Sequence, residues 1–200
     1  MKPKRMNLKR LSVLLIIYCM VVFAGPVFGD VIPGATMDNS PFPSYGTGKV
    51  IVHVYTDYFC VPCRAAEPEL ESLLLELVRS KKITVVFVDT PIHRESQIYA
   101  RYFLYTLKKK NEFEYALHVR SVFFEAAASN INNKEGLEIF LKNKNIDFSI
   151  FDAVPVLKKL NGFLRDDKVT GTPSCVILRD GKSEKKVGGA EILKALKELQ

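Results

Sequence analysis

The hydrophobic pattern of this 200-residue chain changes period several times, and each change predicts a different element. Residues 50–55 and 83–88 are largely apolar, as in β-strands of a sheet that is covered on both faces. Apolar residues at helical spacing between them predict a helix over about residues 61–80, which Pro68 should kink near its first turns. Together these segments form a β-α-β unit with an expected right-handed crossover.

The stretch from residue 95 to about residue 165 has a helical pattern with several aromatic faces. Asn132 is followed three residues later by Glu135, which resembles a capping box at the start of a helix. Apolar residues from Phe148 to Leu160 suggest a further helix, which Pro155 is expected to bend or break. We therefore predict a helical insertion between the second strand and the C-terminal part of the chain.

The C-terminal part returns to a strand pattern over residues 169–178. Asp180-Gly181 indicates a hairpin turn, and residues 185–187 are expected to form a short edge strand. Residues 191–200 are predicted to close the domain as a helix.

The N-terminus has the composition of a targeting segment. Residues 1–10 carry five basic side chains and no acid, and about 14 apolar residues follow before small residues at 25–29. This pattern predicts that residues 1–29 are a signal peptide, cleaved after Ala24 or Gly29. An uncleaved membrane anchor over residues 11–28 is the alternative, although the run is shorter than the roughly 20 residues that span a bilayer. In either case the remainder is exported, to the periplasm or otherwise.

Export changes how the rest of the composition is interpreted. Five of the seven net positive charges belong to residues 1–29, which leaves a net charge of +2 for the remainder and no basic stripe that would bind nucleic acid. Residues 30–48 are rich in Pro, Gly, Ser and Asn and are expected to be a linker or loosely held arm. Residues 49–200 are long enough to bury one core and are predicted to form the domain.

Cys60 and Cys63 are placed where sulfur chemistry is favoured. They stand at the end of the first predicted strand and the start of the first predicted helix. Unsatisfied N–H groups and the positive end of the helix dipole stabilise a thiolate at such a position. Cys60 should be the exposed, attacking sulfur, whereas Cys63, one turn later, should be more buried and within disulfide reach. An exported Cys-x-x-Cys at this place indicates a thiol–disulfide oxidoreductase.

The chain resembles the thioredoxin superfamily over residues 49–200. Gly171-Thr172-Pro173 precedes a strand, and the order strand, Cys-x-x-Cys helix, strand, helical insertion, Thr-Pro strand, hairpin and helix is that of the superfamily. The insertion, at about residues 94–165, and the lead-in Thr56-Asp57-Tyr58-Phe59 resemble the DsbA-like branch. The resemblance implies an α/β thioredoxin fold with an inserted helical subdomain. It also implies that Pro173 is cis beside the cysteines and that Thr172 pairs with an extended substrate.

Some residues depart from the DsbA-like pattern. Pro62 stands where DsbA-type oxidants usually carry histidine, and the Val61-Pro62 dipeptide looks more like thioredoxin and TlpA-type reductases. Val54 stands where many relatives have a buried acid that is thought to accept the proton of the second thiol, so water or Asp57 are the candidates for that task. Asp57, Val61 and Pro62 are thus candidates for tuning the site. The direction of the redox reaction stays open.

The expected function is that of an enzyme, an exported DsbA-like thiol–disulfide oxidoreductase acting on cysteines of exported proteins. Its redox group would be the Cys60–Cys63 disulfide, with no other cofactor. The resemblance implies unfolded or cysteine-containing exported proteins as partners, together with a membrane protein that recycles the disulfide, and a monomer is the default. The alternatives are a TlpA- or thioredoxin-like periplasmic reductase and, in another class, a non-catalytic metal- or protein-binding module.

The remaining histidines and the third cysteine are less informative. A structural zinc site needs four ligands, and His53, His93 and His118 are scattered, so no metal site is predicted. His53, within a strand, should be a hydrogen-bonded core residue, and His93 a loop residue at a helix start. Cys175 should be a small buried hydrophobe, with a regulatory thiol as the alternative.

Overall fold

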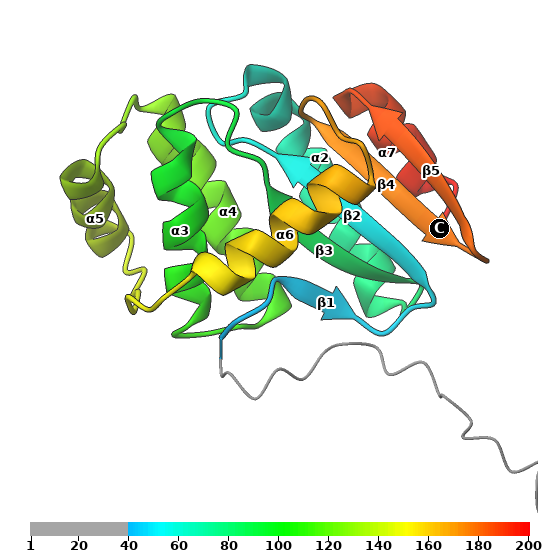
Figure 1. Ribbon diagram of the computed structural model, residues 1–200, viewed down its shortest axis with the longest axis horizontal. Coiled ribbons are helices and arrows are strands. Elements are labelled where there is room, and N and C mark those ends of the chain that lie inside the picture. The colour runs from blue at the N-terminus through cyan, green and yellow to red at the C-terminus, as the bar shows by residue number, and fades with distance from the viewer. Residues whose placement is uncertain (1–39) are drawn as a thin grey trace, which may run out of the picture. The chain divides into compact units, whose positions relative to one another are not determined.

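The structure is a computed structural model, and it describes residues 40–200 (Figure 1). The predicted signal peptide or anchor at residues 1–29, and the first part of the predicted arm, lie outside the described residues. No helix within residues 40–200 is long and apolar enough to cross a membrane. The elements run in the order β1 (Ser44–Gly46), β2 (Val50–Thr56), α2 (Val61–Arg79), β3 (Ile83–Asp89), α3 (Ser96–Leu107), α4 (Phe113–Ala128), α5 (Lys134–Asn143), α6 (Val154–Asp166), β4 (Ser174–Arg179), β5 (Lys182–Val187) and α7 (Gly189–Lys197).

Five strands form one mixed sheet in the order β1-β3-β2-β4-β5. β2 and β3 are parallel, and β4 is antiparallel to β2. The register places Thr56 opposite Asp89 on one side and Tyr55 opposite Ser174 on the other. As a result, the residues that follow β2 and β3 meet the residues that precede β4 at one edge of the sheet.

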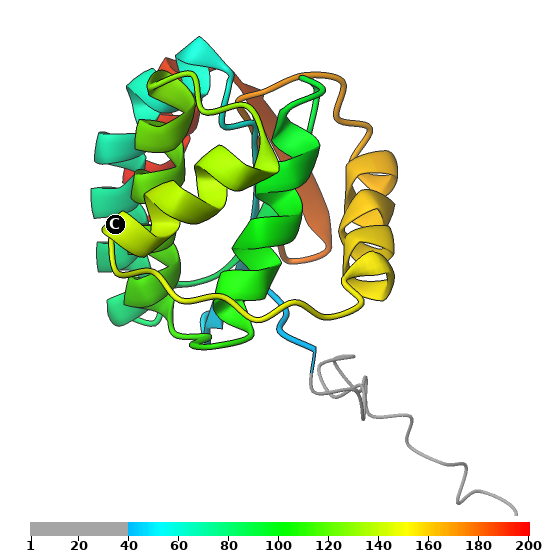
Figure 2. The same cartoon turned by 90° about the vertical axis from the view of Figure 1, so that its left-hand side faces the viewer.

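Helices cover both faces of this sheet (Figures 1 and 2). α2 and α7 pack together on one face, and α6 lies on the opposite face against β3. α2 belongs there because its leucines fall at i, i+3, i+4 and i+7 and are all buried (Leu70, Leu73, Leu74 and Leu77). This is the layered α/β arrangement that the pattern of strands and helices predicts.

Helices α3 to α6 form the predicted insertion between β3 and β4. α4 packs against both α2 and α3, so the insertion is joined to the helix that follows Cys60. Tyr58, two residues before Cys60, is fully buried, and its ring contacts Tyr99 of α3 and Phe123 and Phe124 of α4. The aromatic faces of the insertion therefore form a core around the segment that leads into the cysteines.

The structure corrects three details of the predicted insertion. Pro155 does not bend or break α6; it occupies the first turn, where no helical hydrogen bond is lost. The N-cap of α5 is Asn133 and not Asn132, and its side chain accepts the N–H of Gly136. Phe148 and Phe151 lie ahead of α6 and not within it. The apolar pattern begins at these residues because their rings pack on Tyr102 and Tyr105 of α3.

Three boundaries elsewhere also differ from prediction. β4 begins only at Ser174, β5 begins earlier than residue 185, at Lys182, and α7 begins at Gly189. Asp180 and Gly181 both have positive φ, as a two-residue hairpin turn requires. The strand β1 falls within the predicted arm: residues 44–46 pair antiparallel with β3.

Candidate active site

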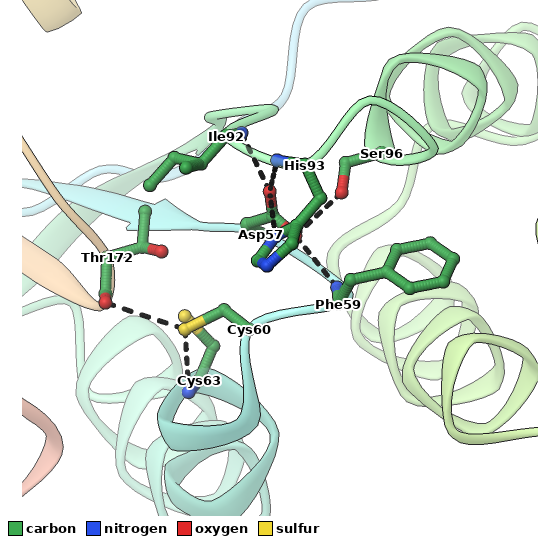
Figure 3. A network of polar contacts seen from close by, with 8 residues as sticks. All are labelled: Asp57, Phe59, Cys60, Cys63, Ile92, His93, Ser96 and Thr172. Carbon is green, nitrogen blue, oxygen red and sulfur yellow. Dashed lines mark hydrogen bonds and ion pairs between the residues drawn. The ribbon is translucent and has the colours of Figure 1, made fainter. Parts of the chain in front are cut away.

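Cys60 and Cys63 lie at the start of α2, as their sequence position predicts (Figure 3). Cys60 is the N-cap residue in an extended conformation, and its sulfur accepts the N–H of Cys63 at 3.3 Å. Pro62 falls in the first turn, where its missing N–H costs nothing. Both cysteines are free thiols.

The prediction that Cys60 is exposed is wrong in degree. Only 8% of Cys60 is exposed, against 1% of Cys63, while Val61 between them is largely exposed. The reason is the loop before β4, whose Thr172 carbonyl accepts the Cys60 thiol at 3.5 Å. Cys60 is still the more accessible sulfur, and Cys63 is enclosed behind it.

Thr172 and Pro173 come to this place because β4 pairs with β2. The Thr172–Pro173 peptide bond is cis, and Pro173 directly precedes the Ser174 that pairs with Tyr55. Its carbonyl accepts the N–H of Gly188, which holds the loop against the end of β5. The loop before β4 therefore contacts the start of α2 at Cys60, although the two segments are more than 100 residues apart in the chain.

The environment of Cys63 favours its neutral thiol. Burial raises the pKa of Cys63 to about 12, and the neighbouring Cys60 sulfur adds to the increase, whereas the Thr172 side chain and the Asp57 main chain lower it. Cys63 is therefore protonated at neutral pH. An outer sulfur that can be reached and an inner one that holds its proton suit the attacking and the resolving positions of a dithiol.

The Asp57 carboxylate lies at the centre of a polar network beside the cysteines (Figure 3). One oxygen accepts the N–H of Phe59 and the Ser96 hydroxyl, and the other accepts the N–H groups of Ile92 and His93 and contacts the His93 ring. Burial alone would raise the pKa of Asp57, but the bonds from Ser96, His93 and Phe59 outweigh it and lower the pKa below its usual range.

Comparison with known proteins places this arrangement in a family. A family model described as thioredoxin matches residues 46–198. The chain belongs to the thioredoxin family. No curated protein sequence matches it significantly.

Solved structures show the same fold as this thioredoxin-family protein. A periplasmic thioredoxin-like protein from Salmonella enterica serovar Typhimurium has a TM-score of 0.59 at 18% identity, covering 98% of each chain. Wolbachia pipientis α-DsbA1 has a TM-score of 0.61 at 14% identity, over 79% of this chain and 90% of that one. The catalytic domain of Proteus mirabilis ScsC has a TM-score of 0.58 at 20% identity, over 80% and 89%.

A buried ionic cluster below the cysteines was not predicted from the sequence of this thioredoxin-family protein. Glu67 lies one helical turn after Cys63 on the same face of α2, and both its oxygens accept from Arg120 of α4 at 2.9 Å. Arg120 is fully buried, donates to the Thr56 hydroxyl and lies 3.9 Å from Asp89. The available signal was a charged residue among apolar ones for Arg120 and Asp89, whereas Glu67 stands among other charged residues of its helix and had no such signal.

Asp89, at the end of β3, has few partners in this cluster. The Tyr58 hydroxyl donates to one of its oxygens at 3.4 Å, and the other oxygen has no hydrogen bond. Burial raises the pKa of Asp89 to about 7, although Arg120 acts in the opposite direction. Val54 is a buried apolar residue of β2, and the buried acids Asp57 and Asp89 stand at the ends of β2 and β3.

The pH dependence of stability should therefore contain a contribution from Asp89. Between about pH 4 and pH 7 folded Asp89 keeps a proton that the unfolded chain releases, so its contribution to stability is full below about pH 4 and is lost as the pH rises through 7. We expect the unfolding free energy of the wild type, relative to Asp89→Asn, to fall by about 2–4 kcal/mol from pH 4 to pH 8. Urea unfolding of the reduced proteins measures it. Asp152→Asn, at an exposed acid, is the control, and a pH-independent difference for Asp89→Asn would contradict the expectation.

The remaining candidates lie outside the site. His53 is a hydrogen-bonded core residue, as predicted: its ring forms a hydrogen bond with Asp167 at 2.7 Å and packs against the ring of Phe163. Cys175 is completely buried, and burial raises its pKa to about 12, which fits the predicted structural role. His118 is exposed on α4. Within residues 40–200 no three His, Cys, Asp or Glu side chains are grouped as metal ligands.

Proposed function

We propose that this protein is an exported, DsbA-like thiol–disulfide oxidoreductase that acts on cysteines of exported proteins through Cys60 and Cys63. The contact that carries the proposal is the one between the Cys60 sulfur, the Cys63 N–H and the Thr172 carbonyl. It combines a sulfur at a helix N-terminus with a strand-forming segment against which a peptide can lie. The family and the similar structures support this choice.

The exchange passes through a mixed disulfide on Cys60. In the oxidising direction a substrate thiolate attacks the Cys60 sulfur of the Cys60–Cys63 disulfide, the S–S bond breaks, and Cys63 takes the electron pair and then a proton. A second substrate thiolate attacks the substrate sulfur of the mixed disulfide, and Cys60 leaves as a thiolate. The substrate loses two electrons and the protein gains them. The reducing direction is the reverse.

The surface around Cys60 is suited to an extended protein segment. Thr172 and Pro173 precede β4 and offer main-chain groups for strand-like pairing. Val61 and Ile92, which flank the site, are more than half exposed, so apolar side chains of an unfolded chain can pack on them. We infer that the substrates are unfolded or cysteine-containing exported proteins. A membrane protein that recycles the disulfide is the expected second partner.

Location rests on the N-terminal sequence and on one neighbour. The basic and apolar composition of residues 1–29 is typical of a signal peptide, and the similar Salmonella protein is described as periplasmic. We therefore propose that the protein works outside the cytoplasm. The TlpA-like reductase is the second candidate, favoured by Val61-Pro62 between the cysteines.

Turnover separates an enzyme from a binding module. The exported domain should accelerate insulin reduction by dithiothreitol, or the refolding of a reduced, disulfide-requiring protein in glutathione buffer, because each assay needs exchange through Cys60. Comparing the two rates, together with the equilibrium constant against glutathione, gives the direction of the reaction. A protein that turns over neither substrate but binds unfolded chains would contradict the proposal and support the non-catalytic alternative.

A further inference from the structure

The Asp57 carboxylate gathers donors from two parts of the chain that β2 and β3 bring together. Phe59 belongs to the turn that leads into Cys60, and its N–H lies 2.8 Å from the carboxylate. Ile92 and His93 belong to the loop after β3, and their N–H groups lie at 2.7 and 3.0 Å. The Ser96 hydroxyl, at the first residue of α3, lies at 2.6 Å. The Asp57 side chain therefore connects the start of the helical insertion, at residues 92–96, to the turn that precedes Cys60.

The main chain of Asp57 contacts the cysteines directly. Its carbonyl accepts the N–H of Cys60 at 3.1 Å, and the carboxylate holds the next residue but one, Phe59, which is the immediate neighbour of Cys60. The ring of Phe59 also packs on Tyr99 of α3, beyond Ser96. The orientation of Cys60 therefore depends on where the 57–59 segment is held.

We propose that Asp57 is a positioning residue, whose carboxylate fixes the 57–59 turn against the 92–96 segment and so holds the Cys60 sulfur beside the Cys63 N–H. The inference rests on the proposed function and extends it. The proposed effect of Asp57 concerns the reduced protein, in which Cys60 is the nucleophile. A Cys60 thiolate would accept from the Cys63 N–H, which lies 3.3 Å from the sulfur, and a displacement that lengthens this distance weakens that stabilisation.

Only a carboxylate satisfies this set of partners. Asp57 is 99% buried, and each of its oxygens faces at least two donors. In asparagine one oxygen becomes an NH₂ group, which would meet either the N–H of Phe59 and the Ser96 hydroxyl or the N–H groups of Ile92 and His93. Glutamate retains the charge but carries it farther along the side chain, into space that the buried site does not offer.

The experiment measures the thiol–disulfide equilibrium of the exported domain with glutathione at pH 7 for wild type, Asp57→Asn and Asp57→Glu. Positioning predicts that both variants shift the equilibrium toward the Cys60–Cys63 disulfide, by about tenfold or about 30 mV, because the thiolate of the reduced form loses its donor. A simple charge effect predicts the opposite for Asp57→Asn, since removal of a nearby negative charge favours a thiolate, and no change for Asp57→Glu.

Further variants separate positioning from loss of stability. Leu141→Ala creates a cavity beneath α5, where Leu141 is fully buried, and should reduce stability without moving the equilibrium, because it weakens both redox forms equally. The double variant Ser96→Ala/His93→Ala removes the Ser96 hydroxyl and the His93 ring from Asp57, and leaves the carboxylate with its three main-chain N–H donors. It should shift the equilibrium in the same direction by about threefold. If Asp57→Asn does not fold, the shift measured for this double variant tests the positioning role of Asp57.

The two proposals can fail separately. A wild-type domain that does not equilibrate with glutathione overturns the proposed function and this inference with it. A wild type that equilibrates, with variants that leave the constant unchanged or shift it toward the dithiol, overturns the role of Asp57 alone.

Discussion

Cys60→Ser will reduce disulfide exchange to the uncatalysed rate. Cys60 is the more accessible of the two sulfurs, and it alone contacts both the Cys63 N–H and the Thr172 carbonyl. A serine hydroxyl cannot form the mixed disulfide through which the reaction passes. Insulin reduction and refolding of a reduced protein both measure the loss.

Cys63→Ser will behave differently and will accumulate mixed disulfides. Cys60 can still attack or be attacked in this variant, but no second sulfur lies behind it to resolve the intermediate. Non-reducing gels or mass spectrometry of the protein mixed with oxidised glutathione detect the adduct. Cys175→Ser is the matched control, because Cys175 is equally buried but lies in β4 and should leave both behaviours intact. An active Cys60→Ser protein would refute the assignment of the nucleophile.

Arg120→Met will be the most destabilising of the single substitutions considered. It removes the guanidinium that donates to both oxygens of Glu67, and leaves this buried carboxylate of α2 without its ion-pair partner. Breaking a buried ion pair from one side costs about 3–5 kcal/mol. Urea unfolding should show the midpoint falling accordingly, with the slope unchanged.

An exposed ion pair provides the control. Arg79 and Glu114 pair at 3.2 Å with both side chains more than half exposed, so Arg79→Met should cost less than about 1 kcal/mol. The double variant Glu67→Met/Arg120→Met should be more stable than Arg120→Met alone, because the unpaired charge is gone. Equal losses for Arg79→Met and Arg120→Met would contradict the argument.

Most of the fold could be predicted from the periods of the hydrophobic pattern. β2, α2, β3 and the helical character of the insertion follow from local spacing, because their buried faces are set by residues close in sequence. β1 could not be predicted in this way. It has only three residues, Ser44–Gly46, and it is held by pairing with β3 some 40 residues later. The start of α6 was missed because Phe148 and Phe151 are apolar for a reason other than helix formation.

The residues of the candidate site could be predicted where they belong to a short sequence motif. Cys60 and Cys63 mark themselves by spacing and by the strand that precedes them, and Thr172 and Pro173 by the order of elements. The cluster of Glu67, Asp89 and Arg120 has no such motif, since each residue comes from a different element and only folding brings them together. The same holds for most partners of Asp57: apart from the nearby Phe59 N–H, its donors from Ile92, His93 and Ser96 are more than 30 residues away.

The buried contacts of Glu67 with Arg120 and of Asp57 with Ser96 limit how the helical insertion can be exchanged between related proteins. A chimera that receives α3 to α6 from a relative without Arg120 and Ser96 keeps Glu67 and Asp57. Its Glu67 carboxylate is then buried without the guanidinium that donates to it, and its Asp57 carboxylate lacks the Ser96 hydroxyl. A successful transplant must carry all four residues, or remove all four. The inserted helices and the helix that begins at the dithiol therefore have to be exchanged together.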